Sequence, residues 1–245
     1  MKTTFKISPL TYIITFSVLL CGYFNYFLII FLILLIHDLG HILLIKRFNY
    51  QIESILILPF GSLINSNIKN NIPSYKLFLI SIAGIIFQLI LASIFHILYS
   101  NGIVNDISYN IFKTYNTIII VFNLLPIIPL DGSKIMQSIL ETKLPYHKTI
   151  ACTYFISLIF IFIFFIKNTI TLNLILVTIF MFYETYKNLI NIDYTYNYFL
   201  LERFLYDIRP NKIKYVKDLK SLYKNYFNFI NNESEKNVLK RRFKP

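Results

Sequence analysis

Charged residues are scarce in this chain, at 15% of its 245 residues, and tryptophan is absent. Hydrophobic residues make up 56%, a composition that excludes an ordinary soluble domain and indicates a polytopic membrane protein. Only two cysteines are present, Cys21 and Cys152, far apart in sequence and both in apolar segments. This pattern excludes a disulfide framework and a zinc knuckle, so we interpret both as packing residues.

Acidic residues are half as numerous as basic ones, 12 against 24, which gives a formal net charge of +12. The short flanks of the apolar runs alternate between rich and poor in Lys and Arg. Lys2 and Lys6 precede the first run and Lys46 and Arg47 follow the second, whereas the loop 101–110 has no basic residue. The positive-inside rule then predicts that both termini are cytoplasmic. The charge is therefore an inside-facing feature and predicts no nucleic-acid partner.

About six apolar runs are long enough to cross a bilayer. They lie at about residues 10–24, 26–45, 75–99, 111–129, 149–166 and 169–187. The first run has no small-residue cleavage site, so we expect no cleavable signal peptide. The sequence thus predicts an all-α polytopic membrane protein, with a six-span domain over residues 1–190 and a short basic cytoplasmic tail over residues 191–245.

Two segments do not fit the pattern of spans. Residues 48–74 are too short and broken for a span, so we predict a re-entrant segment or a short β-hairpin at membrane depth. The tail is rich in Tyr, Asn, Lys and Glu, and 13 of the 24 basic residues lie from Lys187 onward. We interpret it as a solvated tail, or alternatively as a surface that adheres to anionic lipid or to a partner.

The second apolar run contains three polar residues, His37, Asp38 and His41. Histidines four apart lie one turn above the other on one face of a helix, close enough to hold a single metal ion. This is the geometry of H-E-x-x-H zinc sites. Because an aspartate at the centre of a membrane helix is unfavourable by roughly 2.5–3.5 kcal/mol, such residues indicate function. Alternatively, both histidines are neutral and satisfied by hydrogen bonds within a helix bundle.

A two-histidine zinc site needs a third protein ligand and an open position for water. The best candidate lies in the stretch 123–132, NLLPIIPLDG. Pro126 and Pro129 interrupt the helix there, Asp131 follows at the break, and Gly132 gives the chain freedom to turn. By spacing alone, Asp131 could instead cap the helix that follows it.

Together, the motifs at 37–41 and 123–132 resemble the site-2 protease family of intramembrane zinc metalloproteases, and within it the branch of the stage IV sporulation protein FB type. The segments 58–61, 83–84 and 199–203 are also similar to that branch. The resemblance covers roughly residues 8–205. It implies one zinc ion per chain, held by His37, His41 and Asp131, with Asp38 as the general base.

The resemblance also implies that Asn123 holds the substrate strand or orients polar groups, and that Pro129 and Gly132 support the site. The implied enzyme cleaves a membrane-associated regulatory protein, in the most specific version a pro-sigma factor during sporulation. It would reside in a bacterial cell membrane, such as the outer forespore membrane, with membrane inhibitor or scaffold proteins as further partners beside the lipid bilayer.

The sequence departs from that family at three places. The base is normally Glu, and Asp38 is shorter by one methylene; a displacement of about 1 Å can cost on the order of 10²-fold in rate. The shorter side chain of Asp38 supports an alternative function, that of a non-catalytic relative that binds or scaffolds a membrane partner. Gln88 stands where the family has an asparagine. The tail after Arg209 is too short for a nucleotide-binding CBS domain, so no nucleotide regulation is implied.

Another alternative is an ion or metal transporter, because buried His and Asp residues can line a pathway. The polar residues cluster in one site, however, and the fifth and sixth runs are almost free of charge. The sequence therefore favours a protease.

Overall fold

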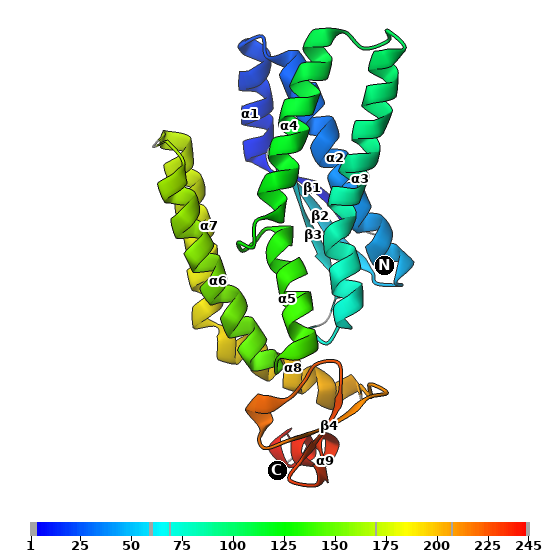
Figure 1. Cartoon of the computed structure of the whole chain (residues 1–245), viewed down its shortest axis with the longest axis vertical. Coiled ribbons are helices and arrows are strands. Elements are labelled where there is room, and N and C mark those ends of the chain that lie inside the picture. The colour runs from blue at the N-terminus through cyan, green and yellow to red at the C-terminus, as the bar shows by residue number, and fades with distance from the viewer. Residues whose placement is uncertain (1–3, 59–60, 69, 170, 207, 244–245) are drawn as a thin grey trace. The chain divides into compact units, whose positions relative to one another are not determined.

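The computed structural model describes residues 4–58, 61–68, 70–169, 171–206 and 208–243 (Figure 1). It divides into two compact units. The first unit comprises Met1–Ile68 and Leu79–Asn123, and the second comprises Lys69–Phe78 and Leu124–Pro245.

The first unit contains four helices and a small sheet. The helices are α1 (Pro9–Leu20), α2 (Phe24–Arg47), α3 (Ser74–Ser100), whose first turn belongs to the second unit, and α4 (Asp106–Leu124). Strands β1 (Thr4–Ile7), β2 (Ile52–Leu58) and β3 (Gly61–Ser66) pair in the order β1-β2-β3, with β1 parallel to β2 and β2 antiparallel to β3. The segment after the second apolar run is thus a β-hairpin. Pro59 and Phe60 lie outside the described residues.

Close packing of α2 on α3 depends on glycine. A Cβ added to Gly40 would lie 2.6 Å from the carbonyl oxygen of Ala83, a distance that a side chain does not tolerate. Small residues of this kind let the backbones of membrane helices approach each other. Apolar side chains then fill the space along α2, α3 and α4; the buried ones are Ile29, Ile33, Leu91, Ile111 and Phe112.

The second unit joins helices to a small C-terminal fold. Its helices are α5 (Asp131–Lys143), α6 (Tyr146–Lys167), α7 (Leu172–Ile190) and α8 (Ile192–Tyr206). They are followed by β4 (Ile213–Val216), the 3-10 turn η1 (Leu219–Ser221), β5 (Phe227–Ile230), β6 (Glu233–Ser234) and α9 (Glu235–Phe243). These strands pair in the order β4-β5-β6, parallel and then antiparallel.

Residues 208–243, here called the C-terminal segment, are folded onto α6 and α8. Leu222 and Leu239 are fully buried in one core with Phe199 and Leu200 of α8. The N–H of Tyr146, at the start of α6, donates to the carbonyl of Leu222 at 2.9 Å. The segment is therefore a folded part of the second unit and not a fully solvated tail, because Leu222, Ile230 and Leu239 are buried in this core.

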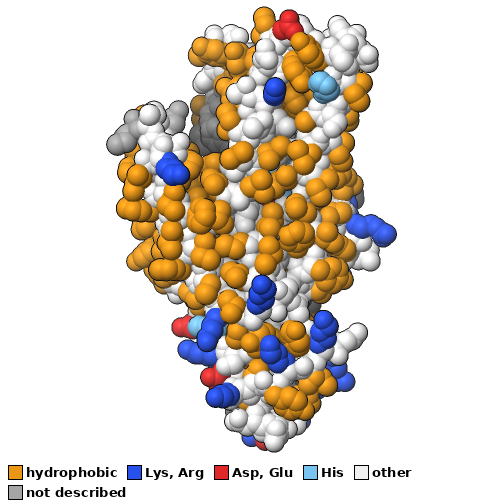
Figure 2. Space-filling view, viewed as in Figure 1, with side chains coloured by type: hydrophobic (Ala, Val, Ile, Leu, Met, Phe, Trp, Pro, Cys, Tyr) orange, Lys and Arg blue, Asp and Glu red, His pale blue; other side chains and the backbone are white. Residues whose placement is uncertain are grey.

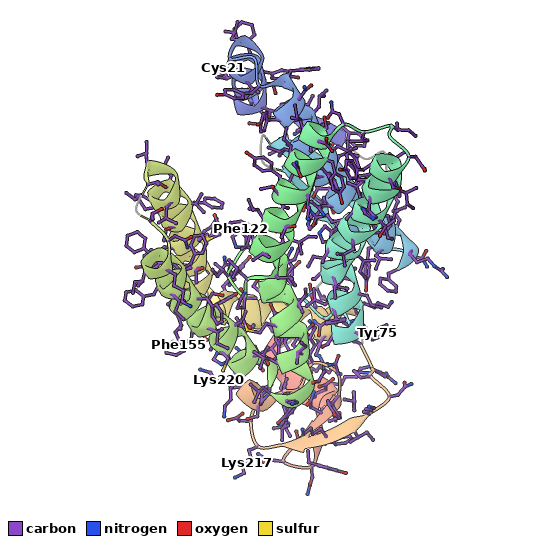
Figure 3. All side chains as sticks on the ribbon, turned by 45° about the horizontal axis from the view of Figure 1, so that its top comes forward. Cys21, Tyr75, Phe122, Phe155, Lys217 and Lys220 are labelled. Atoms are coloured by element: carbon purple, nitrogen blue, oxygen red, sulfur yellow. The ribbon has the colours of Figure 1, made fainter. Side chains whose placement is uncertain are left out.

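Most basic side chains of the C-terminal segment lie on its surface, whereas Lys224 is buried. In Figure 2, Lys and Arg gather over this segment, whereas hydrophobic side chains cover α6 and α7. Lys217 and Lys220, labelled in Figure 3, are exposed, and Phe155 points outward from α6. Such apolar outer faces are suited to lipid contact.

Among the described residues, three helices are long and apolar enough to cross a membrane, namely α2, α3 and α6. The chain is therefore a mostly helical integral membrane protein with small sheets. The expected first span is a helix of only 12 residues, α1. The expected fourth span, 111–129, ends earlier, because α4 stops at Leu124, just before Pro126.

Candidate metal and catalytic site

The histidine pair lies in the middle of α2. His37 and His41 are 6% and 9% exposed, and their ring centroids are 4.7 Å apart. Their Nε2 atoms face each other at 3.0 Å. The helix period thus brings the two imidazoles together on one face, as the spacing predicts.

Two acceptors on α3 fix the orientation of both rings. The Nδ1 atom of His37 lies 3.0 Å from Oε1 of Gln88, and the Nδ1 atom of His41 lies 2.8 Å from the carbonyl oxygen of Ile80. Because an amide or carbonyl oxygen only accepts, each Nδ1 carries the proton and donates. A neutral ring in this tautomer presents a lone pair at Nε2.

Two converging lone pairs at 3.0 Å repel each other unless a proton or a cation lies between or beside them. Zinc binds histidine through such a nitrogen, and metal-bound histidines donate their other N–H to a carbonyl or carboxylate. The alternative, in which hydrogen bonds alone hold the histidines, also accounts for the two Nδ1 contacts. The donor set of this half-site therefore fits a metal ion.

Gly84 leaves the space that the two rings occupy. A Cβ at this position would lie 2.5 Å from Cε1 of His37 and 2.7 Å from Nε2 of His41. Any side chain on this turn of α3 would therefore displace the imidazoles.

Gln88 lies one turn beyond Gly84 on α3 and is fully buried. Its Oε1 orients His37, while its Nε2 has no acceptor among the residues that the structure describes. Sequence reasoning left its role open. The i, i+4 spacing from Gly84 was the available signal that both residues share a face.

Asp38 follows His37 on α2 and is half-buried. Successive residues of a helix point about 100° apart, so its carboxylate projects from the flank of the histidine face. Asn123 is half-buried in the last turn of α4. Both residues belong to the first unit, with the histidine pair.

Asp131 begins α5 in the second unit and is 7% exposed. The N-cap position is Leu130, so Asp131 is the first helical residue and not the cap that its spacing allowed. A carboxylate in the first turn is stabilised by the helix dipole, typically by about 0.3–1 kcal/mol. Nζ of Lys134 lies 3.5 Å from its Oδ1.

The loop before α5 is tightly built. Ser157 of α6 donates to the carbonyl of Pro126 at 3.1 Å, and Ser133 donates through Oγ to that of Leu130 at 2.7 Å. A Cβ on Gly132 would lie 2.3 Å from the carbonyl oxygens at positions 124 and 125. Gly132 is therefore needed for the start of α5 to pack against this backbone. Pro129 is exposed, and its peptide bond is cis.

Comparisons with known proteins agree with these features. The sequence matches Peptidase family M50 over residues 25–115 and 100–164, more than half of the chain. It is 33% identical over 142 residues to the stage IV sporulation protein FB of Bacillus subtilis, covering 58% of this chain and 49% of that protein. It is 30% identical over 162 residues to a zinc metalloprotease of Methanocaldococcus jannaschii, covering 64% and 47%.

The fold resembles that of a solved structure, the site-2 protease from Methanocaldococcus jannaschii, with a TM-score of 0.58 and 23% identity over 77% of this chain and 92% of that chain. The chain spans about half the length of the curated relatives it matches. It belongs to Peptidase family M50, the site-2 protease family of membrane metalloproteases. Within that family it is similar to the stage IV sporulation protein FB.

Proposed function

We propose that this chain is a zinc metalloendopeptidase of the site-2 protease type that hydrolyses a peptide bond of a membrane-associated regulatory protein. The observation that carries the proposal is the converging Nε2 pair of His37 and His41, oriented by acceptors on α3. Membership of Peptidase family M50 supports it.

The proposed site holds one zinc ion per chain through His37, His41 and Asp131. Two imidazoles and one carboxylate are a common donor set of catalytic zinc, which keeps a fourth position open. Zinc supplies Lewis acidity that makes water a nucleophile near neutral pH. The acceptors on α3 keep both histidines in the tautomer that this role needs.

Asp38 is the proposed general base. A carboxylate oxygen takes a proton from the attacking water and passes it to the leaving amine, which general acid–base catalysis requires. Since Asp38 is one methylene shorter than the glutamate of the family, we expect slow turnover. The alternative function, a non-catalytic relative that scaffolds a membrane partner, is supported by this residue alone.

Three further residues have proposed supporting roles. Asn123, in the last turn of α4, holds the substrate strand or orients polar groups. Pro129 and Gly132 shape the loop that delivers Asp131, and the space around Gly132 supports this role.

The proposed substrate is a pro-sigma factor, because one relative is named as a sporulation protein. The corresponding location is a bacterial cell membrane, such as the outer forespore membrane, with about six spans and both termini cytoplasmic. Residues 1–190 would form the membrane domain and residues 191–245 a basic cytoplasmic region. Membrane inhibitor or scaffold proteins are the further partners.

Co-expression with a candidate pro-sigma factor tests the proposal. Wild type, Asp38→Glu, Asp38→Asn and His37→Ala are compared on a blot, and His96→Ala serves as the control because His96 is an exposed histidine on α3. We expect cleavage by wild type, Asp38→Glu and His96→Ala only. Cleavage by Asp38→Glu alone identifies a silenced enzyme, and undiminished cleavage by His37→Ala would contradict the proposal.

A further inference from the structure

Glu141 lies near the opposite end of α5 from Asp131, about 15 Å away along the helix axis. Its side chain is fully buried and accepts three hydrogen bonds. The donors are Ser74 Oγ at 2.6 Å, Gln137 Nε2 at 3.0 Å and Lys224 Nζ at 2.8 Å. The far end of α5 is thus anchored by a carboxylate.

Lys224 comes from the C-terminal segment, and its side chain is 2% exposed. Burial lowers the pKa of Lys224, whereas the adjacent Glu141 carboxylate acts in the opposite direction. An ammonium group in such a place is tolerated only when paired and hydrogen-bonded. The pair therefore fixes where this part of the C-terminal segment lies against α5.

The backbone around Lys224 is held by Arg203 of α8. The Arg203 guanidinium donates to the carbonyls of Tyr223, Lys224 and Tyr226. Its Nη1 also contacts both carboxylate oxygens of Glu235, at the start of α9, at 2.7 Å. This ion pair is buried on both sides. The position of Lys224 is consequently determined by the fold of the whole C-terminal segment.

Asn225 adds a second link beside the first. Its Oδ1 accepts from the N–H of Ser74 at 3.1 Å, and its Nδ2 lies 2.7 Å from the Ser74 hydroxyl, which itself donates to Glu141. The connection to α5 is therefore a closed network of buried and half-buried polar groups, in which each member limits the movement of the others.

A helix of 13 residues such as α5 is marginal by itself, so its position depends on tertiary contacts at both ends. The loop around Gly132 provides those contacts at the start of α5, and Glu141 provides them near its end. We propose that the C-terminal segment is a clamp that positions Asp131, with Lys224 as the positioning residue that holds α5 through Glu141. This inference rests on the proposed role of Asp131 as a zinc ligand.

Zinc affinity of the full-length protein in detergent micelles, measured by competition with a chelator, tests the clamp. Lys224→Met is compared with Lys220→Met, which removes the same charge from an exposed position of the same segment. We expect Lys224→Met to weaken zinc binding by about tenfold, at the low end of the range for residues behind metal ligands. Lys220→Met should bind like wild type.

Cobalt substitution adds a readout that a loss of stability alone does not move. The visible bands of bound cobalt in Lys224→Met should shift toward those of Asp131→Ala, at a temperature where thermal melts show both variants folded. If Lys224→Met does not fold, Lys224→Gln keeps an N–H donor for Glu141 and should show an intermediate weakening.

The outcomes separate the two proposals. Wild-type zinc affinity and cobalt bands in a folded Lys224→Met or Lys224→Gln would overturn the clamp while leaving the protease proposal intact. If wild type binds no zinc, or Asp131→Ala binds it as tightly as wild type, the proposed ligand set is wrong and the clamp fails with it.

Discussion

Replacing Gly84 by alanine introduces one methyl group between α3 and the histidine pair. The added Cβ would lie 2.5 Å from Cε1 and 2.6 Å from Nδ1 of His37, and 2.7 Å from Nε2 of His41. Optimal carbon contacts are about 3.5–4.0 Å, so the rings would have to move by roughly 1 Å. The contacted atoms include the Nδ1 that donates to Gln88 and the Nε2 that faces the other ring.

The same change should favour the helix itself. Alanine is better than glycine in a helix interior by about 0.8–1 kcal/mol, so a simple loss of helix stability is not expected. Disturbed orientation of metal-bound histidines typically costs about 10–100-fold in metal affinity, and a misplacement of about 1 Å can cost about 10²-fold in rate. We therefore expect Gly84→Ala to lose zinc and activity while it keeps most of its helical structure.

Zinc content after dialysis, the helical circular dichroism signal and substrate cleavage are the three measurements. Ser93→Ala is the matched control, because Ser93 is an exposed residue of α3 whose hydroxyl donates to the carbonyl of Leu89 in its own helix. A Gly84→Ala protein with a full zinc equivalent and wild-type cleavage would refute the assignment of this space to the imidazoles.

Three further substitutions test the surroundings of the site. Gln88→Leu removes the acceptor of His37 and should weaken zinc binding by roughly 10–100-fold in a chelator competition; unchanged affinity would contradict the assigned tautomer. Gly132→Ala places a Cβ 2.3 Å from two carbonyl oxygens, so overpacking should lower stability by about 1–3 kcal/mol; an unchanged thermal midpoint would argue against this packing. Glu141→Gln leaves Lys224 without its counter-charge, which should cost about 3–5 kcal/mol; a loss below about 1 kcal/mol in denaturant titrations would contradict a buried ion pair.

Much of the site could be predicted from local sequence, because its pattern is set by helix geometry. The four-residue spacing of His37 and His41 places both rings on one face whatever surrounds them. The prolines before Asp131 end α4 wherever the rest of the chain lies, since proline lacks the N–H that continues a helix. Membrane character followed from composition, because apolar runs of this length have no soluble alternative.

Contacts between residues far apart in sequence decided the parts of the fold and the site that local sequence could not predict. Gln88 and Gly84 contact the histidines only because α3 packs against α2. A single glutamine or glycine in an apolar helix does not indicate which residue of another helix it will contact. The parallel pairing of β1 with β2 joins strands about 50 residues apart, which no local pattern specifies.

The C-terminal segment shows most clearly which features follow from the sequence and which follow from the tertiary structure. By itself the sequence determined that this region is basic, because charge is a property of the chain. Only the tertiary structure decided that Lys224 is buried while Lys220 is exposed. The physical reason is that a lysine is buried only where a carboxylate from another element, here Glu141 of α5, compensates its charge.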